Sequence, residues 1–196
     1  MTIYKKIINT LIFGLLTSIG FAQTTTVSGT ITGAKTNTTV TIKGDNFEQS
    51  VALDENGNYQ FQEVPVGLTV SIAPFKEDAY LNGVSTFDLV LNLRHILSIV
   101  PFEITREYIA ADINVSGNVS IADLVLHRRL LLGDITEFPD VDSWRFIEQS
   151  QYEAIEMDGC IYTNEFTNTF IIQEGENVFN FVGVKMADTN GQAIEN

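Results

Sequence analysis

The chain has 196 residues, of which 44% are hydrophobic and 18% are charged, enough for one domain or two small domains with packed cores. Its Asp and Glu residues outnumber its Lys and Arg residues 25 to 11, which gives a formal net charge of −14. This charge disfavours nucleic acid and anionic membrane surfaces as partners, because few cationic groups are available to neutralise phosphates, and it favours the binding of a cation.

The first 22 residues predict a secretory signal peptide. Lys5 and Lys6 precede the apolar run Ile7–Leu16, and small residues follow at Gly20 and Ala22. The apolar run is too short to cross a bilayer comfortably, so we expect cleavage after Ala22 and no membrane span in the mature protein. The predicted location is therefore extracellular, either secreted or at the cell surface.

Residues 24–74 predict a small antiparallel β-sandwich. Five short runs rich in Val, Ile, Thr and aromatic residues are separated by turn signals containing Gly, Asn, Asp or Pro. The runs read TVSGTI, TTVTIKG, QSVAL, NYQFQEV and LTVSIAP. Between the third and fourth runs, the segment Asp54–Asn58 is typical of a hairpin turn.

From residue 85 the hydrophobic period changes to that of a helix. Segments 85–97 and 120–132 each place Leu and Val residues on one face, which we expect to be buried, and a shorter helix is predicted over 104–111. Eight residues recur between 84–97 and 119–132 at an offset of 35; Ser85 recurs as Ser120 and Asp88 as Asp123. An internal duplication explains this recurrence.

Residues 112–123, which read DINVSGNVSIAD, fit the twelve-residue template of a calcium loop. Oxygen donors fall on alternate residues, Gly117 permits a sharp reversal, and the closing carboxylate can supply two oxygens. Magnesium demands a tighter octahedron, and zinc prefers the His and Cys side chains that this loop lacks. The expected Ca²⁺ ligands are Asp112, Asn114, Ser116, the carbonyl of Asn118, Ser120 and Asp123.

A helix cap without metal is the alternative interpretation of the end of this loop. Ser120 and Asp123 match a capping box, in which each side chain bonds an amide group at the start of the helix. Both arrangements can hold at once, but capping leaves Asp112, Asn114 and Gly117 unexplained.

The first copy of the loop, EDAYLNGVSTFD, departs from the template. It is one residue short if Asp78 opens it, and if Glu77 opens it Ala79 and Leu81 replace two side-chain donors. Capping by Ser85 and Asp88 also accounts for its end. The expected ligands are Asp78, Asn82, Ser85 and Asp88, with main-chain carbonyls completing the shell. Near the end of the sequence, Asp188–Gly191 resembles the opening of another calcium loop but lacks the remainder, so it predicts a turn.

The stretches NGVSTFDLVLNLRHIL and DINVSGNVSIADLVLHRRLLLG, each with a loop closed by Asp and followed by one helix, resemble a type I dockerin over residues 78–135. The earlier pattern VSGTI…TTVTI…DENGNYQFQEVPVGLTVSI resembles the carboxypeptidase-regulatory-like (prealbumin-like) modules of secreted bacterial proteins, which usually serve as spacers or supports. The combination looks like the exported modular proteins of Bacteroidetes-type bacteria.

The dockerin resemblance implies a cohesin-like partner and a role in extracellular assemblies, often for polysaccharide breakdown. In that family the partner contacts lie just before the loop-closing Asp and on basic residues one turn or more later. The matching positions here are Thr86, Phe87, Arg94, Ile121, Ala122, Arg128 and Arg129. Ile, Ala and Phe replace the small hydroxyl residues common in clostridial members, so the same surface could instead pack on this protein's own β module.

The expected fold is a multidomain α+β arrangement in series. A signal peptide at 1–22 precedes a β-sandwich at 23–76, a dockerin-like pair of calcium-loop–helix repeats at 77–137 and a β-rich tail at 138–196, whose strands should pack on the helical part. The expected function is non-catalytic assembly. The alternatives are a carbohydrate-binding accessory protein that uses Trp144, or a structural stalk.

Two histidines and one cysteine complete the candidates. His95 and His127 are expected at a surface or interface, because no nucleophile signature accompanies either. Cys160 is the chain's only cysteine, so it cannot form an intrachain disulfide and is predicted to be a lone structural thiol. A bound metal is therefore a candidate source of stability.

Overall fold

The computed structural model describes residues 23–193, so the predicted signal peptide lies outside the described residues. Within this range no helix is long and apolar enough to cross a membrane. The strands are β1 (Thr24–Thr32), β2 (Thr38–Gly44), β3 (Phe47–Ala52), β4 (Asn58–Pro65), β5 (Thr69–Lys76), β6 (Trp144–Glu148), β7 (Met157–Asp158), β8 (Ile161–Tyr162), β9 (Thr169–Ile171), β10 (Asn177–Val178) and β11 (Phe181–Lys185). The helices are α1 (Thr86–Ile96), α2 (Thr105–Ala111), α3 (Ile121–Leu131) and α4 (Gln149–Glu153).

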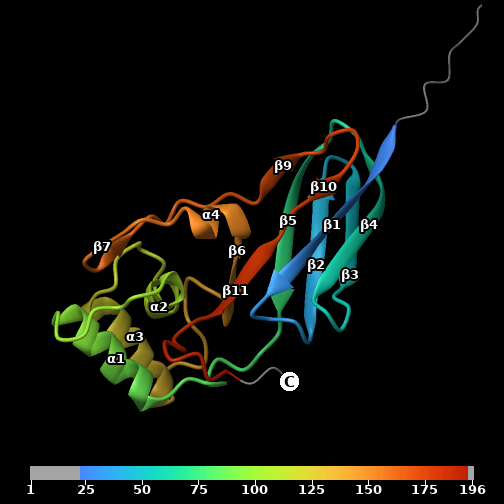
Figure 1. Cartoon of the computed structure of the whole chain (residues 1–196). Helices are drawn as coiled ribbons and strands as arrows, with labels where there is room; N and C mark the ends of the chain where they lie inside the picture. The colour runs from blue at the N-terminus through green and yellow to red at the C-terminus, as the bar shows by residue number, and fades with distance from the viewer. Residues whose placement is uncertain (1–22, 194–196) are drawn as a thin grey trace, which may run out of the picture.

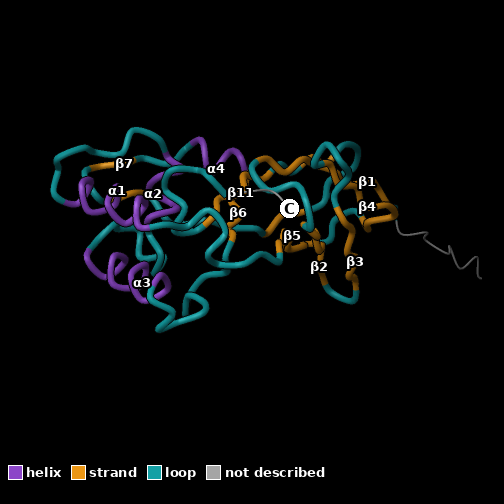
Figure 2. Tube along the Cα trace, turned by 90° about the horizontal axis from the view of Figure 1, so that it is seen from below, coloured by secondary structure: helices purple, strands orange, loops and turns teal. Residues whose placement is uncertain are grey.

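Two β-sheets form one end of the molecule, and α1, α2 and α3 gather at the other end (Figures 1 and 2). One sheet has the order β10-β1-β11-β6, with β4 on the other side of β1, and the second has the order β3-β2-β5-β9. Strands β7 and β8 form a separate two-stranded ladder. The fold is therefore a β-sandwich with a helical end.

Alternation of apolar and polar residues sets which strand faces are buried. β2 buries Val40 and Ile42 and leaves the residues between them less covered, as expected for a strand with one face on a core. β4 buries Phe61 and then Val64, because Glu63 adopts a left-handed backbone (φ 57°) that shifts the alternation by one residue. The five strands predicted over 24–74 are all present.

The predicted arrangement of modules in series is wrong. Strands β10 and β11 both pair in parallel with β1, and β9 pairs with β5, so the segment after residue 138 completes the sheets of the N-terminal sandwich. Strand residues outnumber helical residues across 23–193, which suits a β-rich fold rather than one built on loop–helix repeats. Without the tail, β1 and β5 would be exposed sheet edges, and edge strands readily accept further strands.

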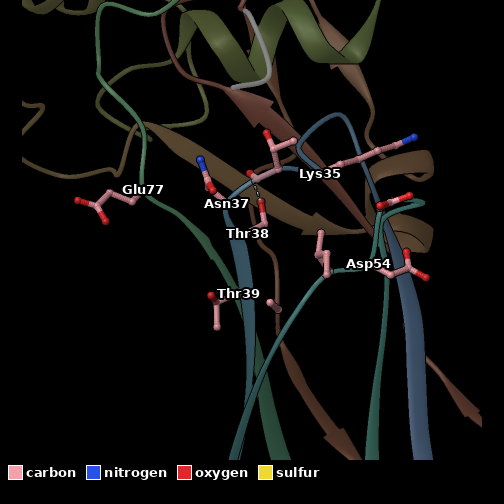
Figure 3. Close-up of a pocket in the computed structure, with 10 residues that line it drawn as sticks. Lys35, Asn37, Thr38, Thr39, Asp54 and Glu77 are labelled. Carbon is pink, nitrogen blue, oxygen red and sulfur yellow. Dashed lines mark hydrogen bonds between the residues drawn. The ribbon is translucent and has the colours of Figure 1, made fainter.

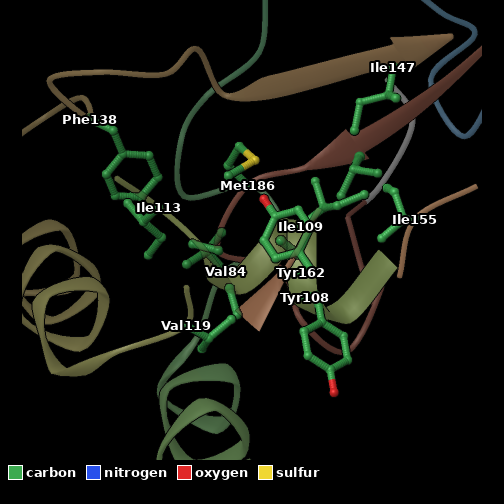
Figure 4. Close-up of a cluster of buried hydrophobic side chains, with 14 of the residues drawn as sticks. Val84, Tyr108, Ile109, Ile113, Val119, Phe138, Ile147, Ile155, Tyr162 and Met186 are labelled. Atoms are coloured by element: carbon green, nitrogen blue, oxygen red, sulfur yellow. The ribbon is translucent and has the colours of Figure 1, made fainter. Parts of the chain in front are cut away.

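A second core joins the helical end to the tail. Figure 4 shows Ile109 of α2, Ile147 of β6 and Met186 together with Ile113 and Val119, and all five are buried. These side chains come from helices, loops and tail strands that are far apart in sequence. The tail therefore packs on both the sandwich and the helical end, where the sequence predicted only the second contact.

Replacing Phe181 with Ala should lower the free energy of unfolding by about 3–5 kcal/mol, because the side chain is fully buried in the sandwich core although it lies in the tail. Chemical denaturation followed by circular dichroism measures this. The control is Phe75→Ala, since Phe75 is 51% exposed and its loss should cost little. A tail that unfolds separately while the sandwich keeps its stability would contradict the shared sheets.

Candidate metal centre

The loop 112–123 connects α2 to α3 and is fixed at both ends by buried apolar side chains. Ile113 and Val119 insert into the second core and are 0% and 1% exposed (Figure 4). The first and last residues of the loop, Asp112 and Asp123, are each 0% exposed. The fold therefore buries two carboxylates at the positions that the calcium-loop template assigns to its first and last ligands.

The opening half of the loop folds around the carboxylate of Asp112. Its oxygens accept the N–H groups of Ser116 at 2.9 Å and Gly117 at 2.8 Å. The hydroxyl oxygen of Ser116 lies 3.3 Å from Asp112 Oδ1 and 3.2 Å from the carbonyl oxygen of Asn118. The Ser116 hydroxyl thus lies within hydrogen-bond distance of two other predicted ligand oxygens, so three potential donors to a cation gather in this half of the loop.

The closing half brings Asp123 to the same place and also forms the predicted capping box. Asp123 Oδ1 accepts the N–H of Asn114 at 3.1 Å, and Oδ2 accepts the N–H and O–H of Ser120 at 2.8 and 3.0 Å. Burial raises the pKa of Asp123, and the neighbouring Asp112 raises it further, against the lowering effect of these hydrogen bonds. The ion pairs formed within residues 23–193 are Lys43–Glu48 and Lys185–Asp78, so neither loop carboxylate has a basic partner there.

Residues of the tail form hydrogen bonds with this loop, a contact that the sequence did not predict. The Tyr162 hydroxyl donates to Asp112 Oδ2 at 2.9 Å, and Asn164 Nδ2 donates to the carbonyl of Val115 at 2.8 Å. Burial raises the pKa of Tyr162, which keeps its hydroxyl a proton donor toward the carboxylate. Arg145 donates to Tyr162 at 3.0 Å and so reaches Asp112 only through that hydroxyl.

The first copy of the loop places its predicted ligands in two groups. Ser85 and Asp88 form the capping box of α1, and Asp88 is 0% exposed. Asp78, in contrast, accepts hydrogen bonds from Trp144 Nε1 at 2.8 Å and Lys185 Nζ at 3.1 Å, and from the predicted ligand Asn82 at 3.1 Å. Although burial raises the pKa of Asp78, these hydrogen bonds lower it below its ordinary value. Asp78 therefore joins the sandwich to the helical end through a buried ion pair.

Helices α1 and α3 turn a largely polar face inward, so the predicted burial of their Leu and Val faces holds only in part: Leu130 is buried and Ile96 and Leu131 pack on the second core. The buried residues of the two helices are Asp88, Asn92, His95, Asp123, His127 and Leu130. Leu93 and Leu97, which the periodicity placed in the core, are 38% and 57% exposed. The predicted partner-binding positions Thr86, Phe87, Arg94, Ile121, Ala122, Arg128 and Arg129 are all exposed.

Both histidines lie inside the helical end rather than at the surface. His127 Nδ1 lies 3.5 Å from the side chain of Asn92, its counterpart in the first repeat, and burial lowers the pKa of His127 to about 4. His95 stacks on Phe102 with ring centroids 4.0 Å apart. Burial raises the pKa of the Cys160 thiol, which favours its neutral form over the reactive thiolate.

The aromatic residues considered for carbohydrate binding are mostly covered. Trp144, Phe138 and Tyr162 are 6%, 4% and 3% exposed. An open hollow elsewhere, shown in Figure 3, lies at the end of β2 that points toward the helical part and is lined by residues including Asn37, Thr39 and Glu77. Asp54 at its rim accepts backbone N–H groups of its own turn, so it serves the hairpin.

Within the described residues, no three or more His, Cys, Asp or Glu side chains gather as a metal-binding group. The loop 112–123 would instead rely on two carboxylates assisted by amide, hydroxyl and carbonyl oxygens, a donor set that suits calcium better than zinc. Comparison of the chain with protein-family models, with curated protein sequences and with solved structures gave no match.

Replacing Lys185 with Met should lower the free energy of unfolding by about 3 kcal/mol or more, because it leaves the carboxylate of Asp78 without its cation in a covered site. Thermal or urea unfolding measures the loss. The matched control is Lys43→Met, which breaks an ion pair whose side chains are 65% and 56% exposed and should cost less than about 1 kcal/mol. Equal losses for the two variants would contradict the structural role assigned to Asp78.

Proposed function

We propose that the chain is an exported, non-catalytic module that binds Ca²⁺ in the loop 112–123 and holds a protein partner on the outward faces of α1 and α3. The observation that supports the calcium site is the burial of Asp112 and Asp123 beside one another, without a basic partner in residues 23–193. Buried charges in proteins are normally paired or coordinate metals. A divalent cation among these oxygens would supply the missing positive charge.

The bound ion would act by fixing the connection between α2 and α3. It would neutralise the mutual repulsion of Asp112 and Asp123 and hold the reversal at Gly117, where φ is 77°. The start of α3 would then be set against α1, which packs beside it. Extracellular calcium modules bind in the range of roughly 10⁻⁴–10⁻³ M, so the ion would be retained outside the cell.

The partner surface combines apolar residues with arginines in a repeated pattern. Val90 recurs as Val125 and Leu97 as Leu132, and these four side chains are 45–62% exposed. Large apolar side chains gathered on a surface often mark a site of protein–protein contact. Arg94, Arg128 and Arg129 lie among them, although the chain as a whole is acidic. The occupant we propose is a cohesin-like module that presents an apolar patch with an acidic rim.

The exposure of this surface favours an external partner over the two alternatives. A stalk in which the helices pack on the protein's own sandwich would cover the partner-binding positions, and all seven are exposed. A carbohydrate site built on Trp144 would require that ring to be accessible, and it is 6% exposed. We therefore place the chain in an extracellular assembly, with polysaccharide breakdown as the setting that the dockerin resemblance implies.

The first test is calcium-dependent stability of the chain without its signal peptide. At about 10 mM CaCl₂ a site with the affinity above stabilises the fold by about 1.4–2.7 kcal/mol, which raises the melting temperature by about 3–10 °C over that in chelator. Asp123→Asn should abolish the part of this rise that comes from the loop 112–123, because one bidentate carboxylate is lost. Differential scanning calorimetry measures both.

The control for this test is Asp134→Asn, which removes an exposed carboxylate just beyond α3 and should leave the calcium-induced rise intact. Identical melting of the unaltered chain in chelator and in CaCl₂ would refute the calcium site.

The second test addresses the partner surface. Val90→Asp combined with Val125→Asp should weaken binding to a cohesin module at least tenfold, because both copies of the apolar pattern acquire a buried negative charge on association. Surface plasmon resonance against purified cohesin modules measures this, and circular dichroism confirms that the exposed substitutions leave the fold unchanged. Phe75→Asp, on β5, is the control outside the surface. Binding that survives the double substitution would contradict this surface.

A further inference from the structure

We propose a second calcium site, assembled from two segments about a hundred residues apart, which rests on the proposed function of the loop 112–123. Its opening half is the segment after β11, and its closing half is the start of α1. The proposed ligands are Asp188, Asn190, Gln192, the carbonyl of Gly83, Ser85 and Asp88.

The opening half repeats the hydrogen bonds of the contiguous loop around its first carboxylate. Asp188 Oδ1 accepts the N–H of Gln192 at 2.9 Å and Oδ2 accepts the N–H of Ala193 at 2.8 Å. In the contiguous loop, Asp112 makes the same two bonds, four and five residues ahead, at 2.9 and 2.8 Å. The segment interpreted from sequence as a plain turn thus has the conformation of a half calcium loop.

The closing half completes the correspondence across the gap in sequence. The N–H of Asn190 donates to Asp88 Oδ1 at 3.0 Å. In the contiguous loop, the N–H of Asn114 donates in the same way to Oδ1 of the closing Asp123 at 3.1 Å. Asp88 Oδ2 accepts the N–H and O–H of Ser85 at 2.9 and 2.8 Å. Asp188 therefore supplies the opening carboxylate that the first repeat lacks.

The point where the loop is interrupted can be located. A Cβ atom at Gly83 would overlap the backbone of Ala193, so the two residues are in close contact. At the offset of 35, Gly83 corresponds to Asn118, and Ala193 holds the place of Gly117 in the opening half. Ala193 thus stands at the sixth position of the split loop and Gly83 at the seventh, with no peptide bond between them. The absence of a side chain at Gly83 (φ 77°) leaves room for Ala193 to come close.

An unsatisfied oxygen points to a missing ligand at this place. Asn190 Oδ1 is buried and has no hydrogen-bond partner within the described residues. It belongs to a loop that also holds Asp88 and Asp188, which are 0% and 2% exposed and form no ion pair in residues 23–193. Arg106 lies nearby but donates to the carbonyls of Asp188 and Thr189, not to the carboxylates. A calcium ion would engage the amide oxygen and compensate both charges.

Native mass spectrometry and calorimetric titration with CaCl₂ test the proposal on the chain without its signal peptide. We expect two ions for the unaltered chain, one for Asp188→Asn, one for Asp123→Asn and none for the double variant. Asp134→Asn, at an exposed position, should keep two ions. One ion in the unaltered chain that Asp123→Asn removes and Asp188→Asn leaves in place would overturn the split site and leave the proposed function standing. If the unaltered chain binds no calcium ion, both the split site and the calcium site of the proposed function are refuted.

A gain-of-affinity variant guards against misfolding of Asp188→Asn. Gln192 is exposed, so Gln192→Asp should not disturb the core, and it adds a carboxylate at the fifth loop position. The dissociation constant of one of the two ions should fall by about tenfold, since calcium affinity follows the charge of the ligand set. Unchanged affinities for both ions in Gln192→Asp would also overturn the split site.

Discussion

The burial of acidic side chains at the starts of α1 and α3 constrains the rest of the helical end. Asp88 and Asp123 point inward with Asn92 and His127 behind them, so the inner faces of the two helices are polar. Val90, Leu97, Val125 and Leu132 are consequently turned outward, where large apolar side chains are not normally gathered, whereas Leu130 and Leu131 still contact the second core. Carboxylates without basic partners are costly to bury, and the proposed ions offset that cost. The proposed calcium sites and the exposed apolar surface thus follow from the same orientation of α1 and α3.

The tail of the chain supports both ends of the molecule. Its strands β10 and β11 extend the sheet beside β1, and the residues that follow pass directly into the helical end. There the N–H of Ala187 donates to the carbonyl of Ala110 at 2.8 Å, which holds the residue before Asp188 against α2, the helix that leads into the contiguous loop. The order of the sheets therefore determines the position of the proposed split site. A chain built from modules in series could not provide this coupling.

The sequence patterns predicted individual strands and helices, but they did not predict which distant strands pair with one another. The strands over 24–74 and the helices followed from periodicity and turn residues. Periodicity could not show which helix face turns inward, because the polar stripe through Asp88 and Asn92 is as regular as the apolar one. Nor could it show that β1 pairs with β11, some 150 residues away. One signal for the split site is present in the sequence: ADIN at 111–114 and ADTN at 187–190 share three identities, but the calcium-loop template covers twelve contiguous residues and does not join distant segments.

The divided loop gives a physical account of why the first repeat departs from the template. The duplicated helix keeps its closing Ser85 and Asp88, whereas Ala79 and Leu81 stand where side-chain oxygens were expected. If the tail supplies those oxygens, no local opening half is needed. An ion shared between the two segments binds only when the tail is docked, so by linkage the binding free energy also stabilises docking. Calcium would then hold the sheet-forming tail and the partner-binding helices in one arrangement, and its removal would loosen both together.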